Sequence, residues 1–251
     1  MFNTINKSQT YKGIFYITRS YCTGKPGQSS SPAGNFLRIG DVVPDFKQES
    51  SLGPISFYKY IYPHVKDIKI NFITSPPHLP YLVCTTELGR VAKLKPEFEK
   101  RNVKVIALSV DGVNDHKNWI KDINETQGVN VDYPIIADSD KSVATKYGMI
   151  HPLADSTFTV RSVYFIGPEK KLRAQITYPP STGRSFDEIL RVIDSLQLTD
   201  KFKVGTPSDW KSGGECVIIP SVSDNEAKSL FPKGWKTLKS YLRVVSDPSK
   251  K

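Results

Sequence analysis

An alternation of strand-like and helix-like apolar patterns after residue 40 constrains the fold of this 251-residue chain more than any other feature. Short apolar runs that are typical of buried strands occupy residues 69–74, 103–110 and 133–137. Between them lie two segments with apolar residues at helical spacing, 85–101 with Leu88, Val91, Leu94 and Phe98, and 114–126 with Trp119 and Ile123. Strands that alternate with helices in this way favour an α/β domain.

The next part of the pattern adds an antiparallel hairpin. After a short predicted helix at 141–147, strands at 160–166 and 172–178 are joined by a Gly-Pro-Glu-Lys turn of suitable length. Residues 186–196 then form a predicted amphipathic helix with Ile189, Leu190 and Ile193 turned inward. This order predicts a three-layer α/β domain with a mixed central sheet over residues 40–199.

The character of the sequence changes after residue 199. Residues 200–251 are richer in Pro, Gly, Lys and Ser, and their apolar residues come in short pieces at 216–219 and 241–245. So small an apolar content predicts an extended C-terminal arm that cannot build a core alone. We expect this arm to pack on its own domain or on a partner subunit.

The first 22 residues are free of acidic side chains, rich in hydroxyl groups, and place apolar residues among spaced cations. This composition is typical of a mitochondrial transit peptide, and Lys7 and Lys12 interrupt the apolar run that a secretory signal needs. We expect import into the matrix, with the cytoplasm as second choice. A disordered basic tail is the plainer interpretation. Residues 23–39 have the composition of a linker.

Charge, hydropathy and residue counts exclude several functions. Of the net charge of +10, half lies in the acid-free residues 1–40, and the remainder has no basic run interleaved with aromatics, so we expect no nucleic-acid partner. No stretch reaches the roughly 18 consecutive apolar residues that span a bilayer. The three cysteines and four histidines lack metal-site spacing, so we expect neither a metal nor an organic cofactor.

Cys84 has a sequence context that favours reactivity. It follows a proline-rich loop and comes directly before the helical stripe that begins at Leu88, which places its sulfur at a predicted helix N-terminus. The free backbone N–H groups and the positive end of the helix dipole favour a thiolate there. The alternative is a small buried hydrophobic residue, the commoner fate of an intracellular cysteine.

The segment around Cys84 closely resembles the active-site helix of the peroxiredoxin family. The resemblance rests on residues 83–90, Val-Cys-Thr-Thr-Glu-Leu-Gly-Arg, and continues through 40–46, Gly-Asp-Val-Val-Pro-Asp-Phe, 159–163, Thr-Val-Arg-Ser-Val, and 182–184, Thr-Gly-Arg. It spans residues 40–245 apart from one segment. The arm has no Val-Cys-Pro resolving motif, so the chain resembles the one-cysteine branch, in particular its fungal mitochondrial members.

The resemblance implies a thioredoxin-like fold and a thiol peroxidase. Cys84 would reduce hydroperoxides and become a sulfenic acid, Arg161 would be the active-site arginine, Glu87 would hold that arginine, and Arg184 would add positive potential. Without a resolving cysteine, an external thiol such as glutathione, glutaredoxin or thioredoxin would complete the cycle. We interpret Cys216 as a packing residue. The family also implies a homodimer onto whose second subunit the arm crosses.

One segment departs from the family pattern. The family's loop reads Pro-x-x-x-Thr-x-x-Cys, and here Pro77 and Cys84 keep the spacing while Tyr81 occupies the threonine position. A tyrosine hydroxyl lies farther out on a rigid ring, so residues 62–82 predict a reshaped or blocked pocket. This motivates a second hypothesis, a catalytically impaired chaperone or thiol redox sensor.

Overall fold

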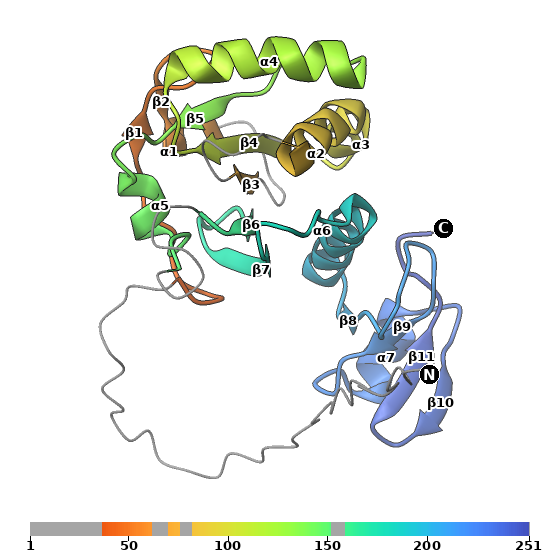
Figure 1. Ribbon diagram of the computed structural model, residues 1–251. Coiled ribbons are helices and arrows are strands. Elements are labelled where there is room, and N and C mark those ends of the chain that lie inside the picture. Colours follow the sequence, from red (N-terminus) through yellow and green to blue (C-terminus); the bar gives the residue numbers. More distant parts are fainter. Residues whose placement is uncertain (1–36, 62–69, 76–81, 152–158, 251) are drawn as a thin grey trace, which may run out of the picture. The chain divides into compact units, whose positions relative to one another are not determined.

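A five-stranded mixed sheet lies at the centre of the structure, a computed structural model that describes residues 37–61, 70–75, 82–151 and 159–250 (Figure 1). The strand order is β5-β4-β3-β6-β7. Strands β3 (Ile70–Ser75), β4 (Lys104–Ser109) and β5 (Ile135–Ala137) are parallel, whereas β6 (Arg161–Ile166) pairs antiparallel with both β3 and β7 (Leu172–Tyr178). The predicted mixed sheet and its hairpin are therefore confirmed.

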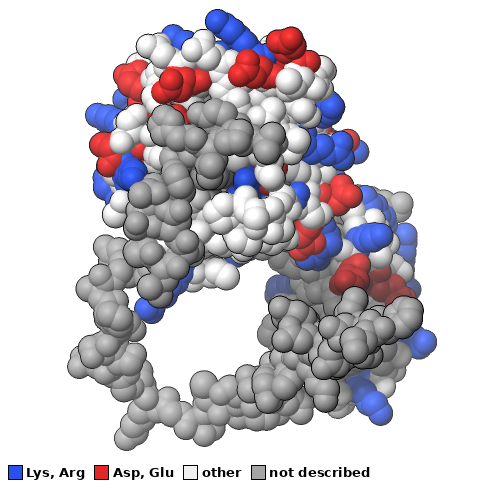
Figure 2. All heavy atoms as spheres, viewed as in Figure 1, with Lys and Arg blue, Asp and Glu red and all other residues white. Residues whose placement is uncertain are grey.

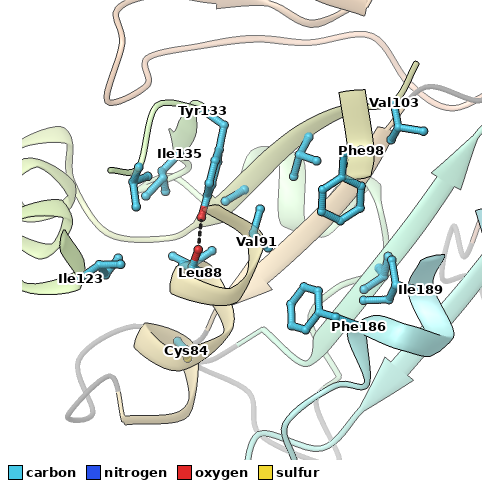
Figure 3. Close-up of a cluster of buried hydrophobic side chains, with 14 of the residues drawn as sticks. Cys84, Leu88, Val91, Phe98, Val103, Ile123, Tyr133, Ile135, Phe186 and Ile189 are labelled. Atoms are coloured by element: carbon cyan, nitrogen blue, oxygen red, sulfur yellow. Dashed lines mark hydrogen bonds between the residues drawn. The ribbon is translucent and has the colours of Figure 1, made fainter. Parts of the chain in front are cut away.

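Alternate side chains of β4 enter two different hydrophobic clusters, because successive residues of a strand point to opposite faces. Val105 and Ala107 join the cluster formed with α2, α4 and α6, part of which Figure 3 shows, and Ile106 and Leu108 join the cluster formed with α1 and α5. This is the three-layer arrangement that the sequence predicts. The helices of this main domain are α1 (Phe57–Ile61), α2 (Leu82–Lys93), α3 (Lys95–Lys100), α4 (Val113–Gln127), α5 (Ser142–Lys146) and α6 (Phe186–Lys201). A small hairpin of β1 (Lys47–Gln48) and β2 (Ile55–Ser56) precedes them.

The prediction of one continuous helix over residues 85–101 is wrong, because α2 ends at Lys93 and α3 begins at Lys95. Pro96 lies in the first turn of α3. It has no N–H to donate to a carbonyl of the preceding turn, and its ring clashes with that carbonyl, so a helix cannot run through it unbroken. The apolar stripe nevertheless keeps its phase, and Leu88, Val91 and Phe98 all lie in one cluster.

Helix α6 is longer than the sequence predicts. It begins after Ser185, whose side chain accepts a hydrogen bond from the backbone N–H of Glu188, and it runs to Lys201, so the predicted domain boundary at residue 199 falls in its last turn. Ile189 and Ile193 are buried as predicted, while Leu190 is only partly buried.

The C-terminal segment forms a sheet with a hydrophobic cluster, which corrects the prediction of an extended arm, while the presence of Leu198 of α6 in this cluster confirms the expectation that the segment packs on its own domain. Its strands form a four-stranded sheet in the order β10-β11-β9-β8, and helix α7 packs with them. Trp210, Cys216, Ile218 and Phe231 are buried in a separate cluster to which Leu198 of α6 also belongs. The elements are β8 (Val204–Gly205), β9 (Cys216–Ile218), α7 (Asp224–Leu230), β10 (Lys236–Lys239) and β11 (Leu242–Val245).

Charges of both signs are interspersed over the described residues on the face that Figure 2 shows. This agrees with the near balance of basic and acidic side chains after residue 40. Within the described ranges, no helix is both long enough and apolar enough to cross a membrane.

Candidate active site

Cys84 lies in the first turn of α2, which begins at Leu82 (Figure 3). Its side chain is 3% exposed and belongs to the same hydrophobic cluster as Leu88 and Val91. The predicted position at a helix N-terminus is therefore confirmed. Apolar side chains therefore surround part of the Cys84 side chain.

Arg161 is the first residue of β6 and supplies a cation beside the sulfur. Its Nη1 atom donates a hydrogen bond to Cys84 Sγ at 3.0 Å, and its Nε atom donates to the carbonyl oxygen of Pro180 at 2.6 Å. The side chain is only 3% exposed. Two contacts at different nitrogens fix the plane of the guanidinium, so its charge has a defined position relative to the sulfur.

Glu87 follows Cys84 by one helical turn and links two arginines. Its Oε2 atom accepts hydrogen bonds from Arg161 Nη1 at 2.9 Å and from Arg184 Nη2 at 2.6 Å. Its Oε1 atom accepts from the backbone N–H of Arg184 at 2.8 Å and from Arg184 Nε at 2.9 Å. The carboxylate is buried, and these four charge-assisted bonds offset the cost of its burial.

Arg184 comes from the loop before α6 and is also buried. Besides its bonds to Glu87, its Nη1 atom donates to the carbonyl oxygen of Ser162 at 3.1 Å. Ser162 is the neighbour of Arg161 on β6. The second arginine therefore ties together α2, β6 and the loop that precedes α6.

The formal charges of this group favour an anion at Cys84. Two guanidiniums and one carboxylate leave a net charge of +1 in a buried site, and a thiolate at Cys84 would bring the sum to zero. Unbalanced charge is costly in a buried environment. The arrangement thus supports a nucleophilic sulfur with a hydrogen-bond donor beside it.

The structure brings together four of the six residues that the sequence singled out, namely Cys84, Arg161, Glu87 and Arg184. Pro77 and Tyr81 lie outside the described residues. As bare residues, the two arginines and the glutamate are typical of surface charges, yet all three are buried. One signal of this was available, because Arg161 opens a strand whose other members are mostly apolar.

Two contacts near the sulfur were not predicted. The carbonyl oxygen of Pro180 orients Arg161, and the indole Nε1 of Trp119 donates to Thr85 Oγ1 at 3.0 Å. A backbone carbonyl carries no side-chain signal. Trp119 was assigned to the core from its helical spacing, and that assignment is correct but incomplete.

Cys216 has a different environment from Cys84 and lies far from it in the sequence. It is fully buried in β9 within the C-terminal cluster, and burial raises the pKa of its thiol to about 11. A thiol that is both inaccessible and protonated is a poor nucleophile. Its environment agrees with the interpretation of Cys216 as a packing residue.

Comparison with known proteins points the same way. A family model described as "AhpC/TSA family" matches residues 39–175, and one described as "C-terminal domain of 1-Cys peroxiredoxin" matches residues 195–234. The 1-Cys peroxiredoxin of Dictyostelium discoideum is 61% identical, over 93% of this chain and 95% of that protein. Peroxiredoxin-6 of Gallus gallus is 47% identical, over 84% of this chain and 98% of its own length.

Two solved structures are similar throughout their length. A mutant of the Peroxiredoxin 6 of Arenicola marina is 44% identical with a TM-score of 0.76, and covers 85% of this chain and all of its own. A yeast mitochondrial 1-Cys peroxiredoxin, studied for its thiol resolving mechanism via glutathione/thioredoxin systems, is 43% identical with a TM-score of 0.76. It covers 84% of this chain and 100% of its own.

Proposed function

The chain belongs to the one-cysteine peroxiredoxins of the AhpC/TSA family and is a thiol peroxidase, and from this premise we propose that Cys84 is its nucleophile. The observation that carries the proposal is the 3.0 Å hydrogen bond from Arg161 Nη1 to Cys84 Sγ at the start of α2. Among the described residues, the other cysteine, Cys216, is buried in a separate cluster.

In the proposed reaction, the Cys84 thiolate attacks the terminal oxygen of a hydroperoxide. A sulfur–oxygen bond forms as the oxygen–oxygen bond breaks, and the bonding electrons leave on the distal oxygen. That oxygen takes up a proton and departs as water or an alcohol, which leaves Cys84 as a sulfenic acid. The sulfur is oxidised and the peroxide is reduced.

Arg161 has two tasks in this proposal. It stabilises the thiolate before the reaction, and its guanidinium lies beside the path along which negative charge moves toward the leaving oxygen. Glu87 and Arg184 act through Arg161, because their shared hydrogen bonds hold its guanidinium in place. They are therefore positioning residues.

We propose that an external thiol reduces the sulfenic acid. The thiol sulfur forms a disulfide bond to Cys84 as water leaves. A second thiol then attacks the sulfur of the bound reductant, so that Cys84 leaves as a free thiol and the two reductant sulfurs depart as a disulfide. Glutathione, glutaredoxin and thioredoxin fit this role. One support is Cys216, whose buried, protonated thiol is a poor nucleophile for resolving the sulfenic acid. The other is the similar yeast mitochondrial 1-Cys peroxiredoxin, which was studied for its thiol resolving mechanism via glutathione/thioredoxin systems. Because Cys84 is only 3% exposed, a thiol can reach its sulfur only if residues around it move.

We also propose mitochondrial import and a homodimer. Import is supported by the acid-free, cation-spaced residues 1–22. The homodimer is supported by Leu238 and Tyr241 of the C-terminal segment, which are 47% and 73% exposed. Incubation with isolated mitochondria tests the first, since a processed, protease-protected product is expected. An unprocessed, accessible product would contradict it.

A stopped-flow titration of the reduced protein with hydrogen peroxide tests the peroxidase assignment. We expect one rapid equivalent of peroxide to be consumed by the wild type and by Cys216→Ser, and none by Cys84→Ser. Equal losses in the two variants would refute Cys84 as the nucleophile. Slow oxidation of an otherwise intact wild type would favour the chaperone or redox-sensor hypothesis that Tyr81 motivates.

A further inference from the structure

A pocket of about 300 Å³ shares Glu87 and Arg184 with the active site. Its lining comes from α2, from the loop before α6 and from the first turn of α6, and it includes Arg90, Gly183 and Asp187. The pocket is open to solvent on its outer side, where Arg90 and Asp187 are exposed. Its volume is at the lower end of the range for small-molecule sites.

Two observations connect this pocket to Cys84. Phe186 lines the pocket and belongs to the hydrophobic cluster that contains Cys84, and Figure 3 labels both side chains. In addition, a Cβ atom added to Gly183 would lie 3.4 Å from Cγ1 of Val83, the residue before Cys84, so the loop of the pocket packs against the chain at the nucleophile. A small molecule bound in the pocket is therefore close to the reacting residue.

The pocket presents one unpaired charge of each sign. Within the described part of the chain, the side chains of Arg90 and Asp187 make no ion pair and no hydrogen bond. Glu87 and Arg184, the other charged residues of the described lining, bind each other. A guanidinium binds a carboxylate through two parallel hydrogen bonds, and a carboxylate binds an ammonium group. The two free charges therefore match a ligand that carries a carboxylate and an ammonium group together.

Among the thiols that fit the proposed reaction, glutathione has this arrangement. Its γ-glutamyl end carries an α-carboxylate and an α-ammonium group on one carbon atom, and its thiol lies on the next residue. A protein reductant presents its thiol from a folded surface, without a free amino-acid end beside it. We propose that Arg90 and Asp187 dock the γ-glutamyl end of glutathione, with Arg90 on the carboxylate and Asp187 on the ammonium group. The inference rests on the proposed function of Cys84.

Docking serves the reduction of the sulfenic acid. The glutathione sulfur forms a bond to Cys84 Sγ, the sulfur–oxygen bond breaks, and the oxygen leaves as water with the proton of the thiol. The Cys84 sulfur is thereby reduced and the glutathione sulfur is oxidised to the mixed disulfide. Because Cys84 is buried, a docked thiol is already present whenever the residues around the sulfur move. Docking therefore increases the second-order rate constant of this step.

The rate constant for reduction of the sulfenic acid tests the proposal. Cys84 is oxidised with one equivalent of hydrogen peroxide, a thiol is added, and the mixed disulfide is followed by quenched flow and mass spectrometry. Each rate constant for glutathione is divided by that for 2-mercaptoethanol, which carries neither charge, so a general change in the reactivity of the sulfur cancels. We expect Arg90→Gln and Asp187→Asn each to lower this ratio by about 3- to 10-fold, as the loss of an exposed charge-assisted contact implies.

Two comparisons separate docking from long-range attraction of the glutathione anion. Lys93→Gln removes an exposed cation from the same helix outside the pocket, so it should leave the ratio within about 2-fold of the wild type. The dipeptide γ-glutamylcysteine should show the full loss in Arg90→Gln. Cysteinylglycine, which lacks the γ-glutamyl residue, should show none.

Several outcomes would overturn the inference. These are an unchanged ratio in Arg90→Gln, equal losses in Arg90→Gln and Lys93→Gln, and equal losses with the two dipeptides. A wild type whose sulfenic acid is reduced by thioredoxin but not by glutathione would overturn it as well, and would leave the proposed peroxidase intact. If hydrogen peroxide does not oxidise Cys84, the proposed function itself fails, which is a different result.

Discussion

Glu87→Gln should weaken both the fold and the reaction, because the carboxylate is the common partner of two buried arginines. Each carboxylate oxygen accepts two hydrogen bonds, Oε2 from Arg161 and Arg184 and Oε1 twice from Arg184. A glutamine amide keeps one acceptor and presents an NH₂ group where the other oxygen was. Whichever way the amide is oriented, two of the four bonds become contacts between donors.

The expected cost in stability follows from burial. Removing the charge of one partner in a buried pair costs about 3–5 kcal/mol, and about 2–4 °C in melting temperature accompanies each kcal/mol in a domain of this size. The two arginines then leave a net charge of +2 around the sulfur instead of +1. We therefore expect Glu87→Gln to lower the melting temperature by about 6–20 °C.

Two effects on the reaction rate oppose each other. The added positive charge can stabilise negative charge on the sulfur, but it adds no new contact to the reacting atoms. Loss of the partner also frees the guanidinium of Arg161, and a displacement of about 1 Å from the reacting atoms can cost on the order of 100-fold in rate. Since the misplacement of Arg161 is the larger effect, we expect oxidation of Cys84 to be about 10- to 100-fold slower.

Stopped-flow oxidation and thermal unfolding measure the two effects separately. Glu97→Gln is the control, because Glu97 is a half-exposed carboxylate that pairs with Arg101 on α3, and such pairs contribute about 1 kcal/mol or less. It should leave the oxidation rate unchanged. An oxidation rate for Glu87→Gln within about 2-fold of the wild type, in a folded protein, would refute the argument that Glu87 positions Arg161.

Three further predictions follow from the sequence and the structure. Tyr81→Thr should raise the rate constant for oxidation of Cys84 in stopped flow, since a short hydroxyl would replace one on a rigid ring; an unchanged rate would mean that the tyrosine points away from the pocket. Burial lowers the pKa of His116 below 6.5, so below pH 6.5 the unfolded chain binds more protons than the folded chain, and the free energy of unfolding decreases as the pH is lowered. His116→Gln should reduce this pH dependence, measured by urea unfolding, by at most about 1.4 kcal/mol per pH unit. Light scattering should show a dimer at micromolar concentration, and a monomer with residues 200–251 intact would contradict the predicted exchange of the arm.

The order of elements could be predicted because each strand and helix of the main domain carries its own period. The unbroken apolar run Val105, Ile106, Ala107 and Leu108, typical of a strand buried on both faces, is such a local signal, and its members do divide between two clusters. The break at Pro96 was missed because the stripe keeps its phase across it. The C-terminal core was missed for a different reason: its residues come from short pieces, such as Val204, Trp210 and Phe231. Only pairing between distant strands brings these pieces together, and no single segment shows a period.

The charged part of the site could not be derived from its residues one at a time. Burying Arg161, Glu87 or Arg184 alone would leave an unpaired charge, which is why each is typical of a surface when it is considered singly. Their burial becomes favourable only as a set, and the partners of Glu87 lie 74 and 97 positions away in the sequence. A hydrophobic residue is buried for reasons that its own segment reveals, whereas a buried charge depends on where its partner folds. It follows that Cys84 belongs to the set as well, since Arg161 donates to its sulfur and a negative charge there would balance the net charge of the other three.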